Sequence, residues 1–276
     1  MSVLANVDRP LTVSANLRCE DADPAVVRAG TYAMDVGDDV VTGWHSHDMH
    51  QLEYAFEGIA EVETATARYL LPPQQAVWIP AGIAHCSTWT NVKAVSVFFD
   101  PAMGLQAGDR VRILAAAPVI REMTLYAKRW PINRMSKDPM ADAFFEALAY
   151  LVVEWLEHET PLCLPTTSDP LVAAAMDYTN EHLADVSLSK VCAAVGASER
   201  SLRRAFVPAT GMSWRRYLLE SRLLKAMALL AQNGQNENVL AIAVAVGFQS
   251  VSAFTRAFGQ YTGETPTGYR QRVRAG

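Results

Sequence analysis

Histidines in the first half of the chain have a spacing that could bind a metal ion or a small molecule. His45 and His47 are separated by one residue, and Gln51 and Glu53 continue the same alternation. Side chains of one parity project from one face of an extended strand, so these four should lie together. Imidazole is a general ligand for zinc, iron, copper and nickel. A third imidazole from a later strand would complete a metal-binding face.

His85 is the expected third imidazole, because it follows the turn Pro80-Ala-Gly82. Three interpretations stay open: the cluster holds a divalent transition metal, it lines a metal-free effector pocket, or it is structural. Gln51 is a neutral amide and a poorer ligand than a carboxylate, so no cofactor is certain. His50 has the opposite parity and should lie outside the site. The candidate metal ligands are His45, His47 and His85, and the candidate effector-pocket residues are His45, His47, Gln51, Glu53 and His85.

A second motif occurs twice in the last third of the chain. Residues 193–206 and 244–258 each contain a glycine, a serine, and an apolar residue four positions before a closing phenylalanine. Each also has an arginine two positions before that phenylalanine. The glycines, Gly196 and Gly247, are 51 residues apart. Such agreement indicates a structural repeat. Each copy has the pattern of a helix, a glycine-containing turn and an N-capped second helix, which predicts two helix-turn-helix units.

The second helix of each unit is expected to enter a major groove of DNA. Leu202 and Phe206 would face inward and leave arginines outside, where arginine can contact guanine or phosphate. A helix over Trp214–Leu230, about 25 Å long, would hold both recognition helices in successive groove turns about 34 Å apart. Pro208 should end the first recognition helix early. The predicted DNA-contacting residues are Arg200, Arg203, Arg204, Ser250, Val251, Ser252, Thr255 and Arg256.

Residues 185–272 resemble the DNA-binding domain of the AraC/XylS family of transcriptional regulators. The resemblance is carried by Leu188–Phe206, by Thr210-Gly-Met-Ser213, and most strongly by Ala241–Phe258 with Gly263-Glu-Thr-Pro266 downstream. It implies sequence-specific binding to double-stranded promoter DNA.

Residues 43–58 and 77–85 resemble the two motifs of the cupin barrel, a double-sheet jelly roll. In cupins a His-x-His pair, a carboxylate and a later histidine bind metal. Gln51 stands where cupins usually have glutamate, and Gly58 lies closer to the histidine pair than is usual. The resemblance implies a sensor domain that either binds a metal or uses its histidines to line a metal-free pocket.

Composition and charge divide the chain into two domains. Its 276 residues, half of them hydrophobic, suit one large domain or two ordinary ones. Residues 1–168 carry 12 Lys and Arg against 21 Asp and Glu, whereas the segment from Val186 onward has a net charge of +8. Pro161–Pro170 holds three prolines in ten residues, which is typical of a stiff linker. We predict a cupin-like effector-sensing and dimerisation domain at 1–165 and a double helix-turn-helix DNA-binding domain at 169–276.

The predicted fold class is an N-terminal β domain, a jelly-roll barrel with trailing helices, joined to an all-α C-terminal domain. Alternation and turn residues over 40–100 predict short strands. Helical periodicity begins after Pro118 and is clearest over Met140–Glu157. Asp169 is the expected N-cap of the helix that follows the linker. The apolar stripe of Phe144–Trp155 either mediates self-association or packs on the barrel.

These features predict a transcriptional activator or repressor and not an enzyme. Its expected partners are promoter DNA, a small-molecule effector, a second copy of the chain, and RNA polymerase if it activates. A metalloregulator is one form of this function, and a metal-dependent cupin enzyme fused to a DNA-binding domain is the alternative. No segment approaches the ~20 apolar residues that span a bilayer, and no secretory signal is recognisable. The four scattered cysteines indicate reduced thiols, so we expect a cytoplasmic protein without a membrane partner.

Overall fold

The chain forms two compact units, one rich in β-strands and one helical. Among the described residues, the first unit contains those up to 162 except 65–68, and the second contains 65–68 and those from 163 onward. The mostly-β then all-helical layout that the sequence predicted is confirmed. The computed structural model describes residues 13–15, 27–37, 40–105, 108–115, 118–160, 162–231 and 238–274.

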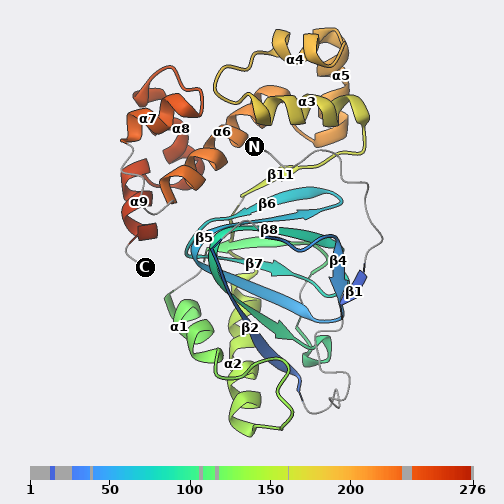
Figure 1. The fold of residues 1–276 in the computed structure, drawn as a ribbon, viewed down its shortest axis with the longest axis vertical. Helices are drawn as coiled ribbons and strands as arrows, with labels where there is room; N and C mark the ends of the chain where they lie inside the picture. The colour runs from blue at the N-terminus through green and yellow to red at the C-terminus, as the bar shows by residue number, and fades with distance from the viewer. Residues whose placement is uncertain are drawn as a thin grey trace. The chain divides into compact units, whose positions relative to one another are not determined.

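The first unit is built around one curved, mainly antiparallel sheet (Figure 1). Its two long strands, β5 (His50–Thr64) and β8 (His85–Phe99), pair antiparallel at the centre. The path through the sheet runs β1-β4-β8-β5-β7-β9-β10, with β2 and β3 also pairing with β8 and β6 with β5. The remaining elements are β1 (Val13–Ala15), β2 (Ala29–Val36), β3 (Val40–Val41), β4 (His45–His47), β6 (Ala67–Leu71), β7 (Gln75–Ile79), η1 (Pro101–Met103), β9 (Arg112–Ala115) and β10 (Glu159–Thr160).

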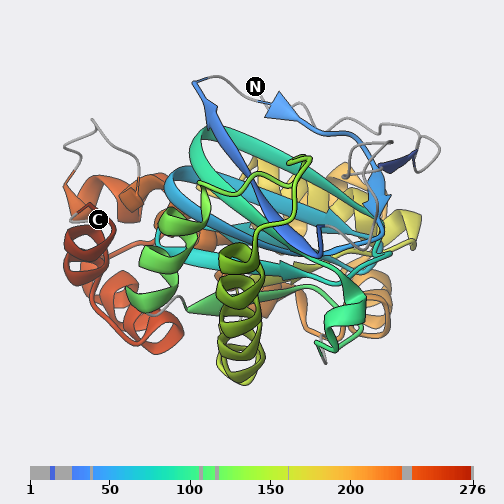
Figure 2. The same cartoon turned by 90° about the horizontal axis from the view of Figure 1, so that it is seen from below.

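Two helices, α1 (Pro118–Ala127) and α2 (Pro139–Trp155), lie against one side of this sheet in both views (Figure 1, Figure 2). The Asp138 carboxylate caps α2 by accepting from the N–H groups of Met140 and Ala141. The inner face of α2 belongs to the same core cluster as strand residues such as Trp78 and Phe99. Leu148 is fully buried there, so the packing alternative accounts for this side chain and it cannot face a second copy. The buried α2 residues are Ala141, Phe145, Leu148, Ala149, Val152 and Trp155.

The second unit begins with the short strand β11 (Cys163–Pro165) and continues as helices. Asp169 caps α3 as expected, because its carboxylate accepts from the backbone N–H groups of Leu171 and Val172. Each helix-turn-helix unit is present, formed by α4 with α5 and by α7 with α8. The helices are α3 (Pro170–Glu181), α4 (Leu188–Ala194), α5 (Glu199–Thr210), α6 (Trp214–Ala231), α7 (Val239–Ala245), α8 (Val251–Thr262) and α9 (Pro266–Arg274).

The two helix-turn-helix units begin their second helices in the same way. Ser198 caps α5 and Ser250 caps α8, each accepting from the N–H three residues later. The turn of the second unit requires glycine, because Gly247 has φ +90° and an added Cβ would lie 2.6 Å from the carbonyl oxygens of Leu183 and Ala184.

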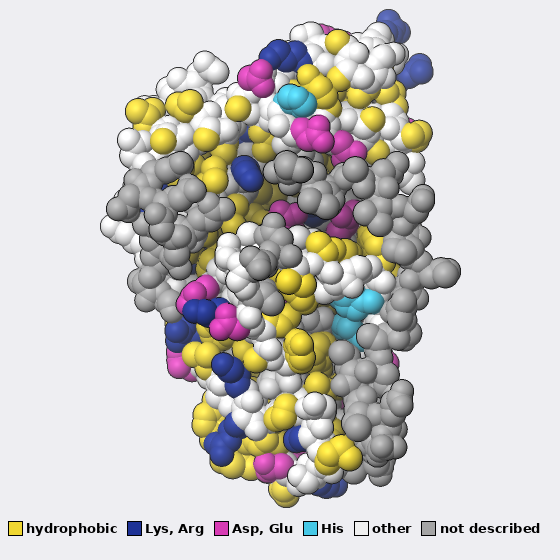
Figure 3. Space-filling model, viewed as in Figure 1, with side chains coloured by type: hydrophobic (Ala, Val, Ile, Leu, Met, Phe, Trp, Pro, Cys, Tyr) yellow, Lys and Arg dark blue, Asp and Glu magenta, His cyan; other side chains and the backbone are white. Residues whose placement is uncertain are grey.

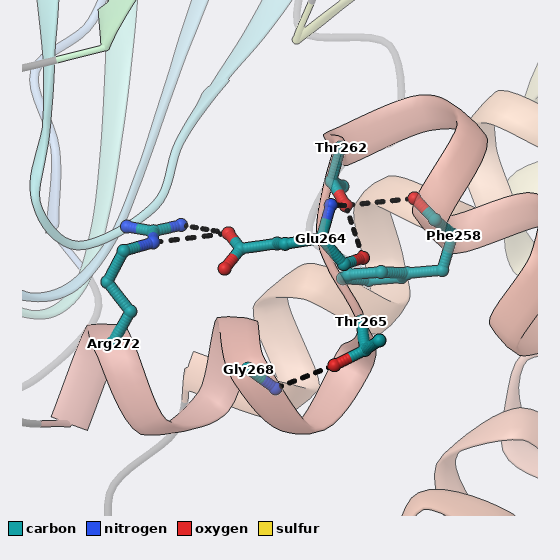
Figure 4. A network of polar contacts seen from close by, with 6 residues as sticks. All are labelled: Phe258, Thr262, Glu264, Thr265, Gly268 and Arg272. Carbon is teal, nitrogen blue, oxygen red and sulfur yellow. Dashed lines mark hydrogen bonds and ion pairs between the residues drawn. The ribbon is translucent and has the colours of Figure 1, made fainter.

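The second helices also end alike. The Thr210 hydroxyl donates to the Phe206 carbonyl at 2.7 Å, and the Thr262 hydroxyl donates to the Phe258 carbonyl at 2.8 Å. A left-handed glycine follows each threonine. Figure 4 shows the second of these ends, where Arg272 of α9 also donates two hydrogen bonds to the Glu264 carboxylate. The duplicated caps give the repeat in the sequence a structural basis.

The prediction that Pro208 ends the first recognition helix was wrong. Helix α5 continues through Pro208 to Thr210. Proline removes the backbone donor that would bond the Arg204 carbonyl, but Arg204 lies on the exposed face of α5, where water can replace this donor, and the last turn keeps its other bonds. There the Gly211 N–H bonds to the Val207 carbonyl at 2.8 Å and the Thr210 hydroxyl satisfies Phe206, so the end of the helix is still capped.

The core of the second unit depends on inward-facing aromatic side chains. Phe206 and Phe258 are fully buried, and Phe258 packs edge-on against Tyr269 at a ring-centroid distance of 5.6 Å. We expect Phe258→Ala to lower the free energy of unfolding by about 3–5 kcal/mol, because it removes a buried ring and leaves a cavity. Urea unfolding followed by circular dichroism measures this change. The exposed Gln260→Ala on the same helix should change it by less than about 0.5 kcal/mol, and equal effects of the two variants would contradict the packing described.

Other sequence expectations concern cysteines and membrane spans. Cys86, Cys163 and Cys192 are not joined in disulfide bonds, and Cys19 lies outside the described residues. None of the helices in the described part of the chain has the length and apolar character needed to cross a bilayer.

Candidate functional site

His45, His47 and His85 meet on the sheet of the first unit. Strand β4 supplies the first two, and β8 begins at the third and pairs with β4 so that His45 and His85 are direct partners. One ring nitrogen from each histidine lies within 4.8 Å of the others. The ring centroids of His45 and His85 are 4.2 Å apart, and those of His47 and His85 are 5.2 Å apart. The structure therefore brings together the three residues that sequence parity and the later turn singled out.

Backbone carbonyls fix the orientation of all three imidazoles. The Nδ1 atoms of His45, His47 and His85 lie 3.0, 2.6 and 2.9 Å from the carbonyl oxygens of Gly43, Met49 and Ile83, respectively. A carbonyl oxygen can only accept, so each Nδ1 must carry the proton. In the neutral rings each Nε2 is then a free acceptor. Metal-binding histidines commonly use this arrangement, with one nitrogen held by the backbone and the other directed at the ion.

Burial keeps the imidazoles of His47 and His85 neutral. It lowers the pKa of His47, and it lowers the pKa of His85 to about 3. The nearby imidazoles lower both pKa values further, since two positive charges at this separation repel. At neutral pH these rings therefore offer lone pairs and not positive charge, which suits them to a cation.

Gln51 links the cluster to a buried carboxyl group. Its Oε1 lies 2.9 Å from His47 Nε2, and its Nε2 lies within 3.1 Å of a carboxyl oxygen of Glu53 and of the Ser96 hydroxyl. Trp89 also donates to Glu53. Glu53 is fully buried, and burial raises its pKa to about 7. The chain from His47 through Gln51 to Glu53 thus couples the cluster to a group that changes charge near neutral pH.

The donor atoms fit a divalent transition metal. With its proton on Nδ1, His47 presents Nε2 as an acceptor, and Gln51 Oε1 beside it is also an acceptor. Two acceptors that face each other repel, and a cation between them would remove this repulsion. Without a metal, a Gln51 amide turned by 180° would donate from its nitrogen to His47 Nε2. Its oxygen would then face Glu53, which must be protonated to donate to it. Three imidazole nitrogens suit zinc, nickel or iron with coordination positions left open.

A cavity of about 580 Å³ opens next to the histidines. This volume is in the range of small-molecule binding sites. On the face shown in Figure 3, histidine side chains reach the surface of the strand-rich unit beside apolar side chains. The residues that line the cavity are Thr31, Tyr32, Ala33, Met34, Thr42, His45, His47, Gln51, His85, Ser87, Trp89, Ser96, Phe98, Lys128, Pro131, Ile132 and Asn133.

The structure sorts the predicted pocket residues into two layers. His45, His47, Gln51 and His85 line the cavity, whereas Glu53 lies beneath Gln51 and is not among the lining residues. Glu53 lies deeper than the lining residues because parity fixes the face of a strand but not the depth at which a side chain ends, and its carboxyl group accepts from Gln51. His50 lies outside the cavity lining, as expected, and stacks on Trp78.

The cavity also has an apolar wall that was not predicted from the sequence. Met34 comes from β2 and Phe98 from β8. Ile132 comes from the segment after α1, as does Lys128, a cation that also lines the cavity. These residues are distant in sequence and follow no common spacing. The pairing of β2 with β8 and the hydrogen bonds of Thr31 with Trp130 and Ile132 bring them together.

The predicted DNA-contacting residues lie on α5 and α8 of the second unit. Arg200, Arg203 and Arg204 are exposed, as are Ser252 and Arg256. Arg203 forms an ion pair with Glu199 at 3.0 Å, one turn away on the same helix. Val251 and Thr255 are half-buried, and the Ser250 hydroxyl caps α8. Arg200, Arg204 and Arg256 are exposed and form no ion pair with other residues that the structure describes.

Comparisons with known proteins agree with this arrangement. Residues 191–272 match a family model described as a helix-turn-helix domain. The HTH-type transcriptional regulator NimR of Escherichia coli strain K12 is 27% identical over 262 residues, which cover 94% of this chain and 93% of that protein. The second unit therefore carries an AraC-type helix-turn-helix domain, and the relative that matches most of the chain is named a transcriptional regulator.

Two further proteins are similar to this chain. An uncharacterised HTH-type transcriptional regulator of Bacillus subtilis strain 168, YobQ, is 22% identical over 230 residues, covering 83% of this chain and 89% of that protein. A crystal structure of a transcriptional regulator with an AraC-type DNA-binding domain from Chromobacterium violaceum is 28% identical in sequence to this chain. It covers 38% of this chain and 94% of its own, with a TM-score of 0.36.

The buried carboxyl group of Glu53 should make the stability of the protein depend on pH. The pKa of Glu53 is raised from 4.5 to about 7, so the folded chain keeps a proton that the unfolded chain releases as the pH passes 4.5. As the pH rises from 4.5 to 7, the free energy of unfolding of the wild type should therefore fall by on the order of 3 kcal/mol because of this group. Glu53→Gln removes the titration, so its stability relative to wild type should rise over this window.

Urea unfolding of both proteins at several pH values between about 5 and 7 checks this expectation. His85 has the opposite effect on stability. Its pKa is lowered in the folded chain, so its contribution to the free energy of unfolding is lost as the pH falls below 6.5. Both proteins contain His85, so its contribution cancels in the difference. A difference that does not change with pH would show that Glu53 is already ionised in the folded chain.

Proposed function

We propose that this regulator senses a small molecule or a metal ion in the first unit and changes its affinity for promoter DNA in response. The observation that carries the proposal is the convergence of one ring nitrogen from each of three imidazoles, with each Nδ1 next to a backbone carbonyl, beside a cavity of about 580 Å³. A site fixed in this way in a DNA-binding regulator is suited to ligand recognition.

The DNA contacts in this proposal come from α5 and α8. Arg200, Arg204 and Arg256 contact base edges or phosphates, and Arg203 contributes less because Glu199 neutralises it. Ser252 and Thr255 are further candidate contacts, together with Val251 for a thymine methyl group. Ser250 acts mainly through its cap, which fixes the start of α8. The net charge of +8 from Val186 onward favours a polyanionic partner.

The domain roles follow the same division. Residues 1–165 form the cupin-like sensing and dimerisation domain, and residues 169–276 form the DNA-reading domain. The protein acts in the cytoplasm as a homodimer on paired half-sites, since half-site symmetry mirrors protein symmetry. RNA polymerase is a further partner if the protein activates transcription. Relatives named as regulators over nearly the whole chain favour this function over an enzyme with a DNA-binding tail.

His45, His47 and His85 would hold the metal, with Gln51 Oε1 beside them. A bound metal would supply a Lewis acid with open positions for oxygen donors. The protein residues do the rest: the carbonyls of Gly43, Met49 and Ile83 orient the three rings, and burial keeps the rings of His47 and His85 neutral. A ligand shifts DNA affinity only if it binds one domain arrangement better than the other.

The test of the proposed function begins with genome-wide footprinting of the purified full chain, which identifies its operators. Operator affinity is then measured after dialysis against a chelator and again after addition of zinc, nickel or iron. We expect specific sites with strong salt dependence, and an affinity that changes with metal or with an effector-containing extract. Operators whose affinity responds to neither would refute sensing in the first unit.

A further inference from the structure

We propose that the cavity takes an aromatic organic anion that chelates a metal held by His45, His47 and His85. This inference rests on the proposed function, because it assigns a ligand class to the proposed sensor site. It follows from three properties of the cavity: the polarity of its histidine end, the chemistry of its opposite wall, and the charge at its rim.

The histidine end presents acceptors and little positive charge. The Nδ1 atoms of His45, His47 and His85 donate to backbone carbonyls, so in the neutral rings the Nε2 atoms are acceptors. An anionic ligand placed directly against these lone pairs would be repelled. A metal ion reverses the sign of this end and makes oxygen anions its preferred partners. The ligand's head is therefore an anionic oxygen chelator bound through the metal.

The opposite wall is apolar and contains rings. Phe98 presents its edge to His47 at a centroid distance of 5.5 Å and an interplanar angle of 87°. Phe98 and Ile132 belong to one buried apolar cluster, and Met34 and Trp89 also line the cavity. This wall begins directly beside the histidines, so an apolar body attached to a chelating head would lie against it. A flat ring makes favourable contacts with aromatic edges and with the methionine sulfur.

The rim adds a positive charge. Among the described residues that line the cavity there is no aspartate or glutamate, and Lys128 is the one cation. Lys128 is exposed and follows α1 directly. Its charge attracts an anion toward the cavity and disfavours a cationic ligand. Acceptor nitrogens, an apolar wall and a basic rim together select an aromatic chelating anion over a sugar or an amine.

The experiment uses the full chain loaded with Co²⁺, whose visible absorption reports on its ligands, and three probes. Benzohydroxamate carries the chelating head and the ring, acetohydroxamate the head alone, and benzamide the ring without an anionic chelating head. We expect benzohydroxamate to bind about 10-fold or more tightly than acetohydroxamate, because its ring is removed from water against the wall. Both hydroxamates should change the Co²⁺ spectrum, and benzamide should not.

Two variants test the wall and the rim separately. Phe98→Leu keeps an apolar side chain but removes the ring, and should reduce the preference for benzohydroxamate over acetohydroxamate at least about 3-fold in the Co²⁺-saturated chain. Lys128→Met should weaken both hydroxamates about 2- to 5-fold. The matched control is Arg129→Met, which removes the neighbouring exposed charge outside the cavity lining and should change neither affinity. Circular dichroism confirms that each variant is folded.

Equal affinities for the two hydroxamates, binding of benzamide as tight as that of benzohydroxamate, or a chain that takes up no Co²⁺ would each overturn the inference. These results are independent of DNA. A chain that prefers benzohydroxamate but whose operator affinity responds to no metal or effector extract would refute the proposed function and leave the ligand class intact. A chain whose operator affinity responds to metal or effector extract, but which does not prefer benzohydroxamate, would refute only the ligand class.

Discussion

Arg204→Ala is expected to weaken binding to a specific operator by about 5- to 150-fold, corresponding to about 1–3 kcal/mol for a base-contacting arginine. Arg204 is exposed on α5, two residues before the buried Phe206 that anchors the helix. Arg256 occupies the same place on α8, two residues before Phe258. If either arginine reads a base, its loss should also relax sequence preference at one position of its half-site.

Gel-shift titrations against the mapped operator and against single-base variants measure both effects. Arg203→Ala is the matched control, since its guanidinium is already paired with Glu199 at 3.0 Å and should contribute less. A phosphate contact would instead weaken all sequences alike and reduce the salt dependence by about one charge. Small and equal losses for Arg204→Ala, Arg256→Ala and Arg203→Ala on every sequence would exclude base reading by these helices.

His85→Ala is expected to lower metal affinity by at least about 100-fold. It removes one of three nitrogen ligands, whereas loss of a group that only orients a ligand already costs about 10- to 100-fold. Equilibrium dialysis with zinc or nickel measures the loss. His158→Ala is the matched control, because His158 is exposed and lies outside the cluster. Tight metal binding by a folded His85→Ala variant would show that the metal occupies another site.

Local spacing was sufficient to predict the histidine cluster. His45 and His47 share a strand face by parity, and Gln51 has the same parity at the start of the adjoining strand. His85 needed more information, because its position depends on the antiparallel pairing of β8 with β4. The turn at Pro80-Ala-Gly82 and the cupin resemblance supplied that information indirectly.

Long-range packing was not predictable in the same way. Met34, Phe98 and Ile132 reach the cavity through the pairing of β2 with β8 and the hydrogen bonds between Thr31 and the segment after α1. Neither contact leaves a periodic signal in the sequence.

Burial depth and helix length also escaped the sequence analysis. Parity placed Glu53 on the correct face but not at the correct depth, where its carboxyl group binds Gln51 and Ser96. Pro208 was expected to end the helix. The Arg204 carbonyl, which loses its donor, belongs to an exposed residue, and Thr210 and Gly211 still cap the last turn.

The central claim is that the histidine cluster controls DNA binding, and its most direct test is the coupling between the two. Operator affinity of wild type, His47→Ala and His85→Ala is measured with and without metal or an effector-containing extract, and circular dichroism confirms folding. We predict that wild type changes its affinity by about 5-fold or more, a usual size for coupling between sites. Both variants should bind the operator and lose this response. A wild-type response in both folded variants would contradict the claim.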